Sequence, residues 1–274
     1  MAVSDELLIV DLDAGDADAG MALSTEAGWN QTAEDWGHFV AQGRTFGMRD
    51  PSGRLIATAS ALPYDGPFGF ISMVLVTADW RRRGIATRLV DRCIGELHAL
   101  GLVPVLDATA AGAEVYRRQG FVGQFAFDRW QGSVDTSASE PVQPVEEDLI
   151  RTLDAEVAGV GRHRLIDDFL SRQGTRAVAG ADGFAMARDG RRAVQAGPVV
   201  AADEGAAIRL VERLFRAVRG TVFIDVPSVW RGIGEWLQAR GFEIQRSFTR
   251  MALGRAEPFG QPARLFAVAG PEFG

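Results

Sequence analysis

A run of three arginines directly before a glycine is the part of this chain best suited to chemistry. Arg81 begins the run, Gly84 ends it, and a segment with helical spacing follows. The first turn of a helix leaves backbone N–H groups without intrahelical partners, and the helix dipole is positive there. Glycine lets a ligand approach the backbone closely, and arginine adds charge that suits a phosphate. The spacing therefore indicates a site for a small phosphorylated ligand or, alternatively, a strand-to-helix turn with solvated arginines.

Two apolar patterns flank this turn and should hold it in place. Residues 70–76 are almost continuously apolar and predict a buried strand. The apolar positions of the following helix are Ile85, Leu89, Cys93, Leu97 and Leu100. Gly101 comes next and suits a C-terminal cap. We therefore expect a buried strand, a tight turn and a helix with an open N-terminus, with Cys93 in the core rather than acting as a catalytic thiol.

The overall composition is that of an acidic globular chain. It has 274 residues, of which 47% are hydrophobic and 24% charged, and a formal net charge of −7. Binding to nucleic acid or to an anionic membrane needs clustered positive charge, so neither partner is expected. The single cysteine excludes an intrachain disulfide. The 3 histidines share no metal-ligand spacing, so no metal is expected either.

The sequence also bears on where the protein works. No apolar run is long enough to span a bilayer. The first residues carry Asp5 and Glu6 and lack the basic n-region of a secretory signal. We therefore expect a cytoplasmic protein.

Before the arginines, the chain predicts an edge strand, two helices and three further strand segments. The expected ranges are residues 7–12, 16–27, 33–41, 45–48, 55–62 and 68–76. Thr32 should cap the second helix, with Asp35 in the capping-box position. Trp29 and Trp36 lie close together among polar residues, which is typical of a pocket wall and equally of a helix–helix corner.

After the arginines, residues 102–106 predict a strand with Asp107 and Thr109 at its C-terminal end. Polar groups at such strand ends lie where ligands bind in α/β sheets. A short helix through residue 119 and a strand at residues 121–130 should follow. Residues 133–144 are polar and contain proline, which predicts a linker.

The second half of the chain repeats the first in a weaker form. Residues 184–200 resemble 46–62, residues 208–213 resemble 87–92, residues 222–225 resemble 105–107, and residues 236–242 resemble 116–121. The arginines have no counterpart, and Asp203 and Glu204 stand near the helix N-terminus, where they would repel a diphosphate. Trp236 or a neighbour replaces Tyr116 and has no phenolic hydroxyl. We therefore predict a domain at residues 1–132, the linker at 133–144, and a degenerate domain at 145–274.

Two motifs resemble a known family. The pattern Arg81-x-x-Gly84-x-Ala86, after a strand ending at Val76, resembles the acyl-CoA signature of the GNAT superfamily of N-acetyltransferases. Residues 116–121, Tyr-Arg-Arg-Gln-Gly-Phe, resemble the Tyr-x-x-x-Gly-Phe ending of the same superfamily. Both motifs in this order and at this interval are fairly specific. Over nearly its full length the chain is similar to a bacterial group that joins a complete GNAT domain to a GNAT-like domain without the CoA loop.

This resemblance implies an α/β (α+β) fold of GNAT type, with two GNAT-like domains that are each a mixed, mostly antiparallel sheet flanked by helices. It implies direct transfer of an acetyl group from acetyl-CoA to a primary amine of a small molecule, with one active centre per chain. The alternatives are a protein or peptide amine as acceptor, and a non-catalytic acyl-CoA sensor. A tandem chain of this kind would be a monomer that imitates a dimer, or a weak homodimer.

The resemblance also assigns roles to residues. Tyr116 is the candidate general acid for the departing thiolate, or else a structural aromatic. Asp107 and Glu26 are candidate proton acceptors for the amine, although Asp107 could equally serve only to orient its loop. The predicted cofactor-binding residues are Val74, Leu75, Val76, Arg81, Arg82, Arg83, Gly84, Ile85, Ala86 and Thr87, and a backbone N–H near Val74 would stabilise the oxyanion. The predicted substrate-binding residues are Trp29, Asn30, Asp35, Trp36, Tyr64 and Thr109, whose acidic member favours a cationic amine.

Overall fold

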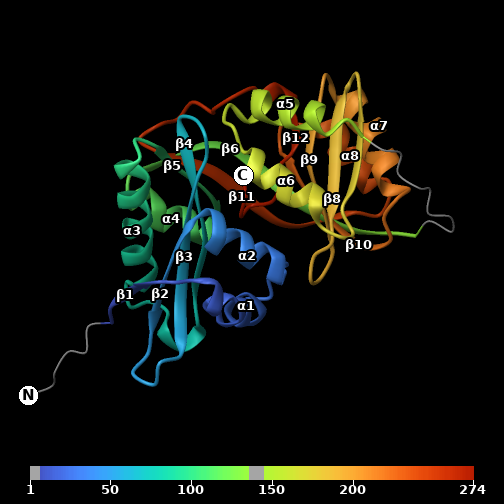
Figure 1. Ribbon diagram of the computed structural model, residues 1–274. Coiled ribbons are helices and arrows are strands. Elements are labelled where there is room, and N and C mark those ends of the chain that lie inside the picture. Colours follow the sequence, from blue (N-terminus) through green and yellow to red (C-terminus); the bar gives the residue numbers. More distant parts are fainter. Residues whose placement is uncertain (1–6, 136–144) are drawn as a thin grey trace, which may run out of the picture. The chain divides into compact units, whose positions relative to one another are not determined.

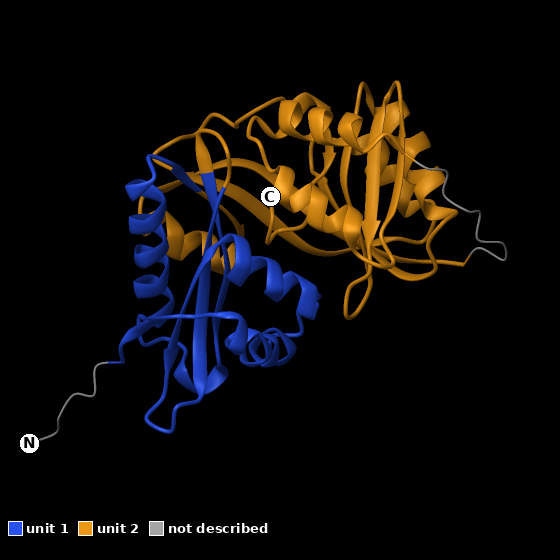
Figure 2. Ribbon diagram, viewed as in Figure 1, with its two compact units in different colours: residues 1–63, 69–104 blue, residues 64–68, 105–274 orange. Residues whose placement is uncertain are grey.

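A computed structural model describes residues 7–135 and 145–274 (Figure 1). Contacts group the chain into two compact units, which Figure 2 colours separately. Unit 1 contains residues 1–63 and 69–104, and unit 2 contains residues 64–68 and 105–274. Most of the predicted linker, residues 136–144, lies outside the described residues, and its first two residues end the strand β6 (Phe121–Val134).

Unit 1 is an antiparallel sheet covered by helices on both faces. Its elements are β1 (Ile9–Asp11), α1 (Ala17–Glu26), α2 (Ala33–Gln42), β2 (Arg44–Arg49), β3 (Leu55–Pro63), β4 (Phe68–Val76) and α3 (Ile85–Ala99). The strands follow the order β1-β2-β3-β4, and each neighbouring pair is antiparallel. Helices α1 and α2 cover one face and α3 covers the other (Figure 1). Every residue of β3 except Pro63 is buried for this reason, and the elements expected before the arginines are confirmed.

The corner between α1 and α2 is built around Trp36. Its indole N–H donates to the Ser24 hydroxyl at 3.0 Å. Its ring packs against Gly20 so closely that a Cβ on Gly20 would lie 2.5 Å from a ring carbon. The predicted capping box is confirmed, because Thr32 accepts from the Asp35 N–H and the Asp35 carboxylate accepts from the Thr32 N–H. Trp36 therefore belongs to a helix–helix corner, the second of its two interpretations.

Helix α3 carries the expected apolar stripe with one exception. Ile85, Leu89, Cys93 and Leu97 are buried, whereas Leu100 is 59% exposed. The prediction for Leu100 was wrong because the helix ends at Ala99 and Leu100 is already the capping residue. Gly101 has a φ of 73° and donates its N–H to the His98 carbonyl at 2.9 Å, which confirms the predicted cap. Burial also raises the pKa of the Cys93 thiol, as expected for a core residue.

Unit 2 contains a longer, mixed sheet. Its elements are β5 (Val103–Thr109), which begins at the boundary of the units, α4 (Ala110–Arg118), β6, α5 (Glu147–Ala158), α6 (His163–Ser171), β7 (Arg176–Gly180), β8 (Gly183–Arg188), β9 (Val194–Ala201), α7 (Glu204–Phe215), β10 (Gly220–Pro227), α8 (Arg231–Gln238), β11 (Glu243–Leu253) and β12 (Leu265–Ala267). The strand order is β5-β11-β6-β10-β9-β8-β7, with β12 paired to β9. All its pairs are antiparallel except β9 with β10, so the expected mostly antiparallel architecture is confirmed.

The internal repeat is visible in the order of the elements. The series β2, β3, β4, α3, β5, α4, β6 recurs as β7, β8, β9, α7, β10, α8, β11. Residues 184–200 form β8 and β9, which directly precede α7, so their counterparts are β3 and β4. The alignment of residues 184–200 with 46–62 was therefore wrong by one strand. Successive strands of an antiparallel sheet have similar apolar patterns, and the pattern alone does not number them.

The last strands of the two halves are exchanged within unit 2. Strand β11 of the second half pairs with β5, and strand β6 of the first half pairs with β10. The two exchanged strands also pair with each other in the middle of this sheet. Contacts therefore group β5, α4 and β6 with the second half, although the sequence repeat assigns them to the first. The predicted domain boundaries describe the repeat and stay a prediction.

Candidate functional site

Residues 77–84, between β4 and α3, form a turn that we name the arginine loop. Arg81 donates its Nε–H to the Val76 carbonyl at 3.0 Å. Arg83 donates to the Asp79 carbonyl at 3.1 Å, and its guanidinium lies 4.6 Å from the centre of the Trp80 ring. All three arginines are exposed. Backbone and ring contacts thus position two of the arginines while their charge stays at the surface.

The N-terminus of α3 is open to an anion. Gly84 is the N-cap residue, with a φ of 76° in the left-handed region, and no side chain caps the first turn. A Cβ on Gly84 would meet nothing within 4 Å, so the backbone conformation rather than crowding calls for glycine. Arg82 is also left-handed, with a φ of 62°. The first-turn amides and the positive end of the helix dipole therefore face the exposed arginines.

The second half shows the same framework without this loop. Only Ala202 and Asp203 connect β9 to α7. The Asp203 carboxylate accepts from the Ala206 N–H at 2.8 Å and so caps the helix. The Glu204 carboxylate accepts from the Ile233 N–H at 3.0 Å. The helix that matches α3 is thus capped by the Asp203 carboxylate, and a second carboxylate, that of Glu204, lies in its first turn.

Glu26, a predicted proton acceptor, holds the start of the arginine loop. Its carboxylate accepts from the Thr77 hydroxyl at 2.7 Å and from the Ala78 N–H at 2.8 Å. These hydrogen bonds lower the pKa of Glu26, because they favour the ionised form, and Arg81 contributes in the same direction. Its geometry is that of a residue that positions the loop, and a lowered pKa weakens a carboxylate as a base.

A bulge interrupts β4 just before the predicted cofactor strand. Leu75 lies opposite Thr58 and Ser72 opposite Ser60, so Met73 and Val74 share one partner residue on β3. Met73 has a φ of 52°, and its carbonyl accepts from the Thr58 hydroxyl at 2.8 Å. Bulges redirect backbone groups and are frequent next to active sites. This one lies at the predicted oxyanion donor near Val74.

Two buried polar atoms in unit 1 were missed by the sequence reasoning. Ser72 and Gln31 are each 5% exposed, and the Ser72 Oγ and Gln31 Oε1 have no hydrogen-bond partner among the described residues. An unpaired buried polar group is costly and calls for an explanation such as a ligand. Ser72 was detectable as the lone hydroxyl in an apolar strand, and Gln31 as a neighbour of Asn30.

The predicted acceptor residues of unit 1 differ in exposure. Asn30 and Asp35 are 6% and 3% exposed, whereas Trp29 is half-buried. The Asp35 carboxylate is engaged in the capping box described above. Unit 1 thus brings these residues, Glu26 and the arginine loop into one compact unit, and their role toward a substrate stays a prediction.

The predicted residues of unit 2 have structural contacts of their own. Asp107 lies inside β5, which is longer than expected, and not beyond its end. Its buried carboxylate accepts two hydrogen bonds from Arg250, at 2.9 and 2.7 Å. Burial raises the pKa of Asp107, and Arg250 opposes that change. Thr109 caps α4, and the half-buried Tyr116 packs edge-on against Phe121 at 6.0 Å.

Tyr64 also belongs to unit 2, although it follows β3 directly. Its hydroxyl donates to the Phe273 carbonyl at 2.8 Å. Burial raises the pKa of Tyr64, so the hydroxyl keeps its proton. Within the structure this hydroxyl is a donor to the final residues of the chain.

Two further features concern metals and membranes. In the part of the chain that the structure describes, no cluster of three or more His, Cys, Asp and Glu side chains could hold a metal ion. None of the helices among the described residues has the length and apolar character needed to cross a membrane.

Comparison with protein families gives a match in each half. Residues 16–121 match a model described as "Acetyltransferase (GNAT) family". Residues 150–267 match a second model, described as "Acetyltransferase (GNAT) domain". The arginine loop lies inside the first match, and the carboxylate-capped helix α7 lies inside the second.

Individual relatives extend over most of the chain. An uncharacterized N-acetyltransferase of Bacillus subtilis, YitH, is 25% identical over 235 residues, which cover 81% of this chain and 83% of that protein. A crystal structure of a candidate acetyltransferase of Pyrococcus horikoshii has a TM-score of 0.79 at 18% identity and covers 100% of this chain and 98% of the other. A tandem GNAT protein from the clavulanic acid biosynthesis pathway has a TM-score of 0.60 at 18% identity, with 90% and 98% coverage. The last two share the fold over both halves.

Proposed function

The chain belongs to the GNAT family of acetyltransferases, with one matched domain in each half, and on this premise we propose that it transfers an acetyl group from acetyl-CoA to a primary amine of a small molecule. The observation that carries the proposal is the arginine loop in front of the uncapped helix α3. The matching helix α7 is capped by Asp203 and has no such loop. One acetyl-CoA site per chain follows from this difference.

The residues present fit the cofactor. The first-turn amides at residues 84–87 and the exposed arginines would hold the diphosphate. The backbone of Val74 and Val76, past the bulge of β4, would pair with the pantetheine arm as with an added strand. Bound acetyl-CoA supplies the activated acyl group. Glu26 keeps the start of the loop in place through Thr77 and Ala78.

Three residues are proposed for proton transfer. Tyr116 is proposed as the general acid because of its motif, since a phenol can donate a proton to a departing thiolate. Glu26 and Asp107 remain candidates for the proton acceptor. Both carboxylates already accept hydrogen bonds in the structure, and these bonds compete with that role.

The acceptor is proposed to be a small cationic amine. Trp29, Asn30 and Asp35 supply aromatic, polar and acidic groups, and the unpartnered atoms of Gln31 and Ser72 supply two further acceptors of hydrogen bonds. An ammonium group needs acceptors of this kind. We further propose that the protein acts in the cytoplasm as a monomer, because the two halves already complete one another within one chain.

A calorimetric titration with acetyl-CoA tests the proposal. We expect one site per chain and at least a tenfold weaker affinity in the variant with Arg81, Arg82 and Arg83 replaced by glutamine, because charge-assisted hydrogen bonds to phosphate are lost. The matched control replaces Arg213, Arg216 and Arg219, three exposed arginines of the second half, and changes the net charge equally. Equal affinities in the two variants would overturn the assignment of the loop.

Turnover on a panel of amines then tests the acceptor class. Acetylation of small amines supports the proposal, and acetylation of peptides alone would replace it with a protein acetyltransferase. Acetyl-CoA binding without turnover on any amine would favour an acyl-CoA sensor.

A further inference from the structure

Strands β9 and β10 are parallel neighbours over only part of their length. Residues 194–196 of β9 lie opposite residues 222–224 of β10. Gly197 and Pro198 then form a bulge, because both fall between Val199 and Ala196 and share one partner residue on β8. Beyond this bulge the pairing of β9 with β10 ends. The bulge matches the one in β4, which also precedes the last residues of its strand.

The end of the chain occupies the opening beyond the bulge. In β12, Leu265 lies opposite Val200 and Ala267 opposite Val199. The next residue, Val268, donates its N–H to the carbonyl of Asp225 on β10 at 3.0 Å. Residues 265–274, here named the closing segment, therefore connect to both strands where these two no longer pair with each other.

The closing segment approaches the backbone of β9 closely and buries its side chains in the opening. A Cβ on Gly197 would lie 2.1 Å from the Val268 carbonyl oxygen, and Gly197 has a φ of 141°. No other residue type could stand there with the segment in place. Phe266 is 1% exposed, and its ring lies 4.3 Å from that of Trp230. Residues 265–269 are all buried, as in a core strand.

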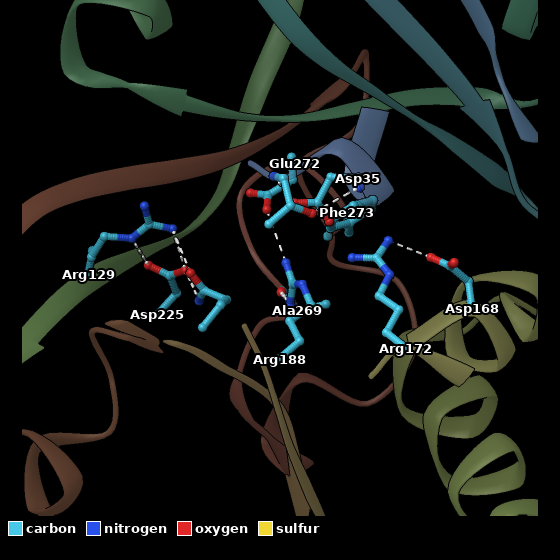
Figure 3. A network of polar contacts seen from close by, with 12 residues as sticks. Asp35, Arg129, Asp168, Arg172, Arg188, Asp225, Ala269, Glu272 and Phe273 are labelled. Atoms are coloured by element: carbon cyan, nitrogen blue, oxygen red, sulfur yellow. Dashed lines mark hydrogen bonds and ion pairs between the residues drawn. The ribbon is translucent and has the colours of Figure 1, made fainter. Parts of the chain in front are cut away.

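Buried charged groups hold the far end of the closing segment. Arg188 donates to the Ala269 carbonyl at 2.6 Å and to the Glu272 carboxylate at 3.0 Å (Figure 3). Arg162 donates to the Phe273 carbonyl at 3.2 Å. The Phe273 ring is fully buried and lies 5.2 Å from that of Phe169. Two buried arginines thus bind carbonyl and carboxylate groups of one short peptide.

We propose that the opening between β9 and β10, beyond the bulge at Gly197 and Pro198, is a strand-binding site whose ligand is the chain's own closing segment. The segment takes the position along β9 that the pantetheine arm is proposed to take along β4. The second domain is then closed to acyl-CoA for a reason beyond the missing loop. Its ligand class is a peptide that is extended at residues 265–267, has small residues at positions 267, 269 and 270, and ends in a turn at 271–273 that carries an acidic residue and phenylalanine. The comparison with pantetheine rests on the proposed function, whereas the binding of a peptide does not.

Binding of the segment in trans tests this proposal. A chain that ends at Ala263 should bind a fluorescent synthetic peptide of residues 264–274 with one site, and the full chain should not. N-methylation of Val268 in the peptide removes the donor to Asp225 and should weaken binding about fivefold or more, since one hydrogen bond is lost. A shortened chain with native circular dichroism that binds no peptide, or binds both peptides equally, would overturn the proposal.

A second measurement on the full-length protein does not depend on the folding of the shortened chain. The Val268 amide should be protected from hydrogen exchange, and Gly197→Ala should raise its exchange rate at least tenfold. The matched control is Gly220→Ala, at another glycine of positive φ whose Cβ would meet nothing within 4 Å. Exchange of Val268 at the rate of an unstructured peptide, or equal rates in both variants, would contradict the proposal. Neither readout uses acetyl-CoA or an amine, so its failure is separate from a failure of the proposed function.

Discussion

Arg250 on β11 and Asp107 on β5 form a buried ion pair that joins the two halves of the chain. An equivalent pair is formed by Arg129 on β6 and Asp225 on β10, with two bonds of 2.8 Å (Figure 3). In both pairs the arginine side chain is 12% exposed and the carboxylate 0%. Each arginine comes from an exchanged strand and each carboxylate from the strand it joins. Two matched ion pairs thus fix the exchange of β6 and β11.

The two pairs should contribute unequally to stability. Gln195 also donates to the Asp225 carboxylate, at 2.8 Å, whereas Arg250 supplies both bonds described for Asp107. We expect Arg250→Met to lower the free energy of unfolding by about 3–5 kcal/mol, because it leaves a buried carboxylate uncompensated. The matched variant Arg129→Met should lose less free energy of unfolding, because Gln195 still donates a hydrogen bond to the Asp225 carboxylate. Urea unfolding of both variants measures the difference, and a larger loss for Arg129→Met would contradict this account.

Gly84→Ala should weaken acetyl-CoA binding, and a control variant with a similar loss of stability should not. The left-handed conformation costs about 1–2 kcal/mol for alanine. The control is Gly101→Ala at the other end of α3, where φ is 73° and a Cβ also meets nothing within 4 Å. We expect similar losses of stability in thermal unfolding, but weaker acetyl-CoA binding for Gly84→Ala alone. Unchanged affinity in Gly84→Ala would remove the helix N-terminus from the cofactor site.

The contact between Glu26 and the arginine loop should persist across the neutral pH range. Hydrogen bonds from Thr77 and Ala78 lower the pKa of Glu26 below its ordinary value of 4.5. A lowered pKa means that the stabilising contact is complete above 4.5 and is lost as the pH falls through the lower folded-state pKa. The Ala78 amide shift in an NMR titration should therefore change with a midpoint below 4.5. That transition should be absent in Glu26→Gln, and a midpoint above 4.5 would contradict the geometry.

Ser72→Ala should leave the unliganded protein as stable as before or make it more stable. The Ser72 hydroxyl is buried and has no partner among the described residues, so its removal relieves a penalty of about 1–3 kcal/mol at most. The control, Ser60→Ala, removes a buried hydroxyl that shares a 2.9 Å hydrogen bond with Thr45 and should cost about 1 kcal/mol. Urea unfolding compares the two. If Ser72 contacts a ligand, turnover or amine affinity should fall in Ser72→Ala while stability does not.

Local chemistry explains what could be predicted from the sequence. The capping box of Thr32 and Asp35, the glycine cap at Gly101 and the strand at residues 68–76 depend on neighbours within a few positions. The open N-terminus of α3 was predictable for the same reason, because Gly84 and the arginines are adjacent in the chain.

Long-range pairing explains what could not be predicted. Asp107 was expected beyond a strand end, whereas Arg250, 143 positions away, fixes it within β5. The residues near Asp107 in the sequence do not indicate a partner at that distance. The insertion of β12 beside β9, the role of Tyr64 as a donor to Phe273, and the shift of the repeat by one strand have the same origin.

The exchange of β6 and β11 also bears on how such a chain can be divided. A cut within residues 136–144 would separate the two sequence repeats, yet it would leave β6 beside β10 and β11 beside β5. The first fragment would lack β11, which pairs with β5, and the second would lack β6, which pairs with β10. The two repeats are therefore not independent modules, because each completes its sheet with a strand that the other encodes.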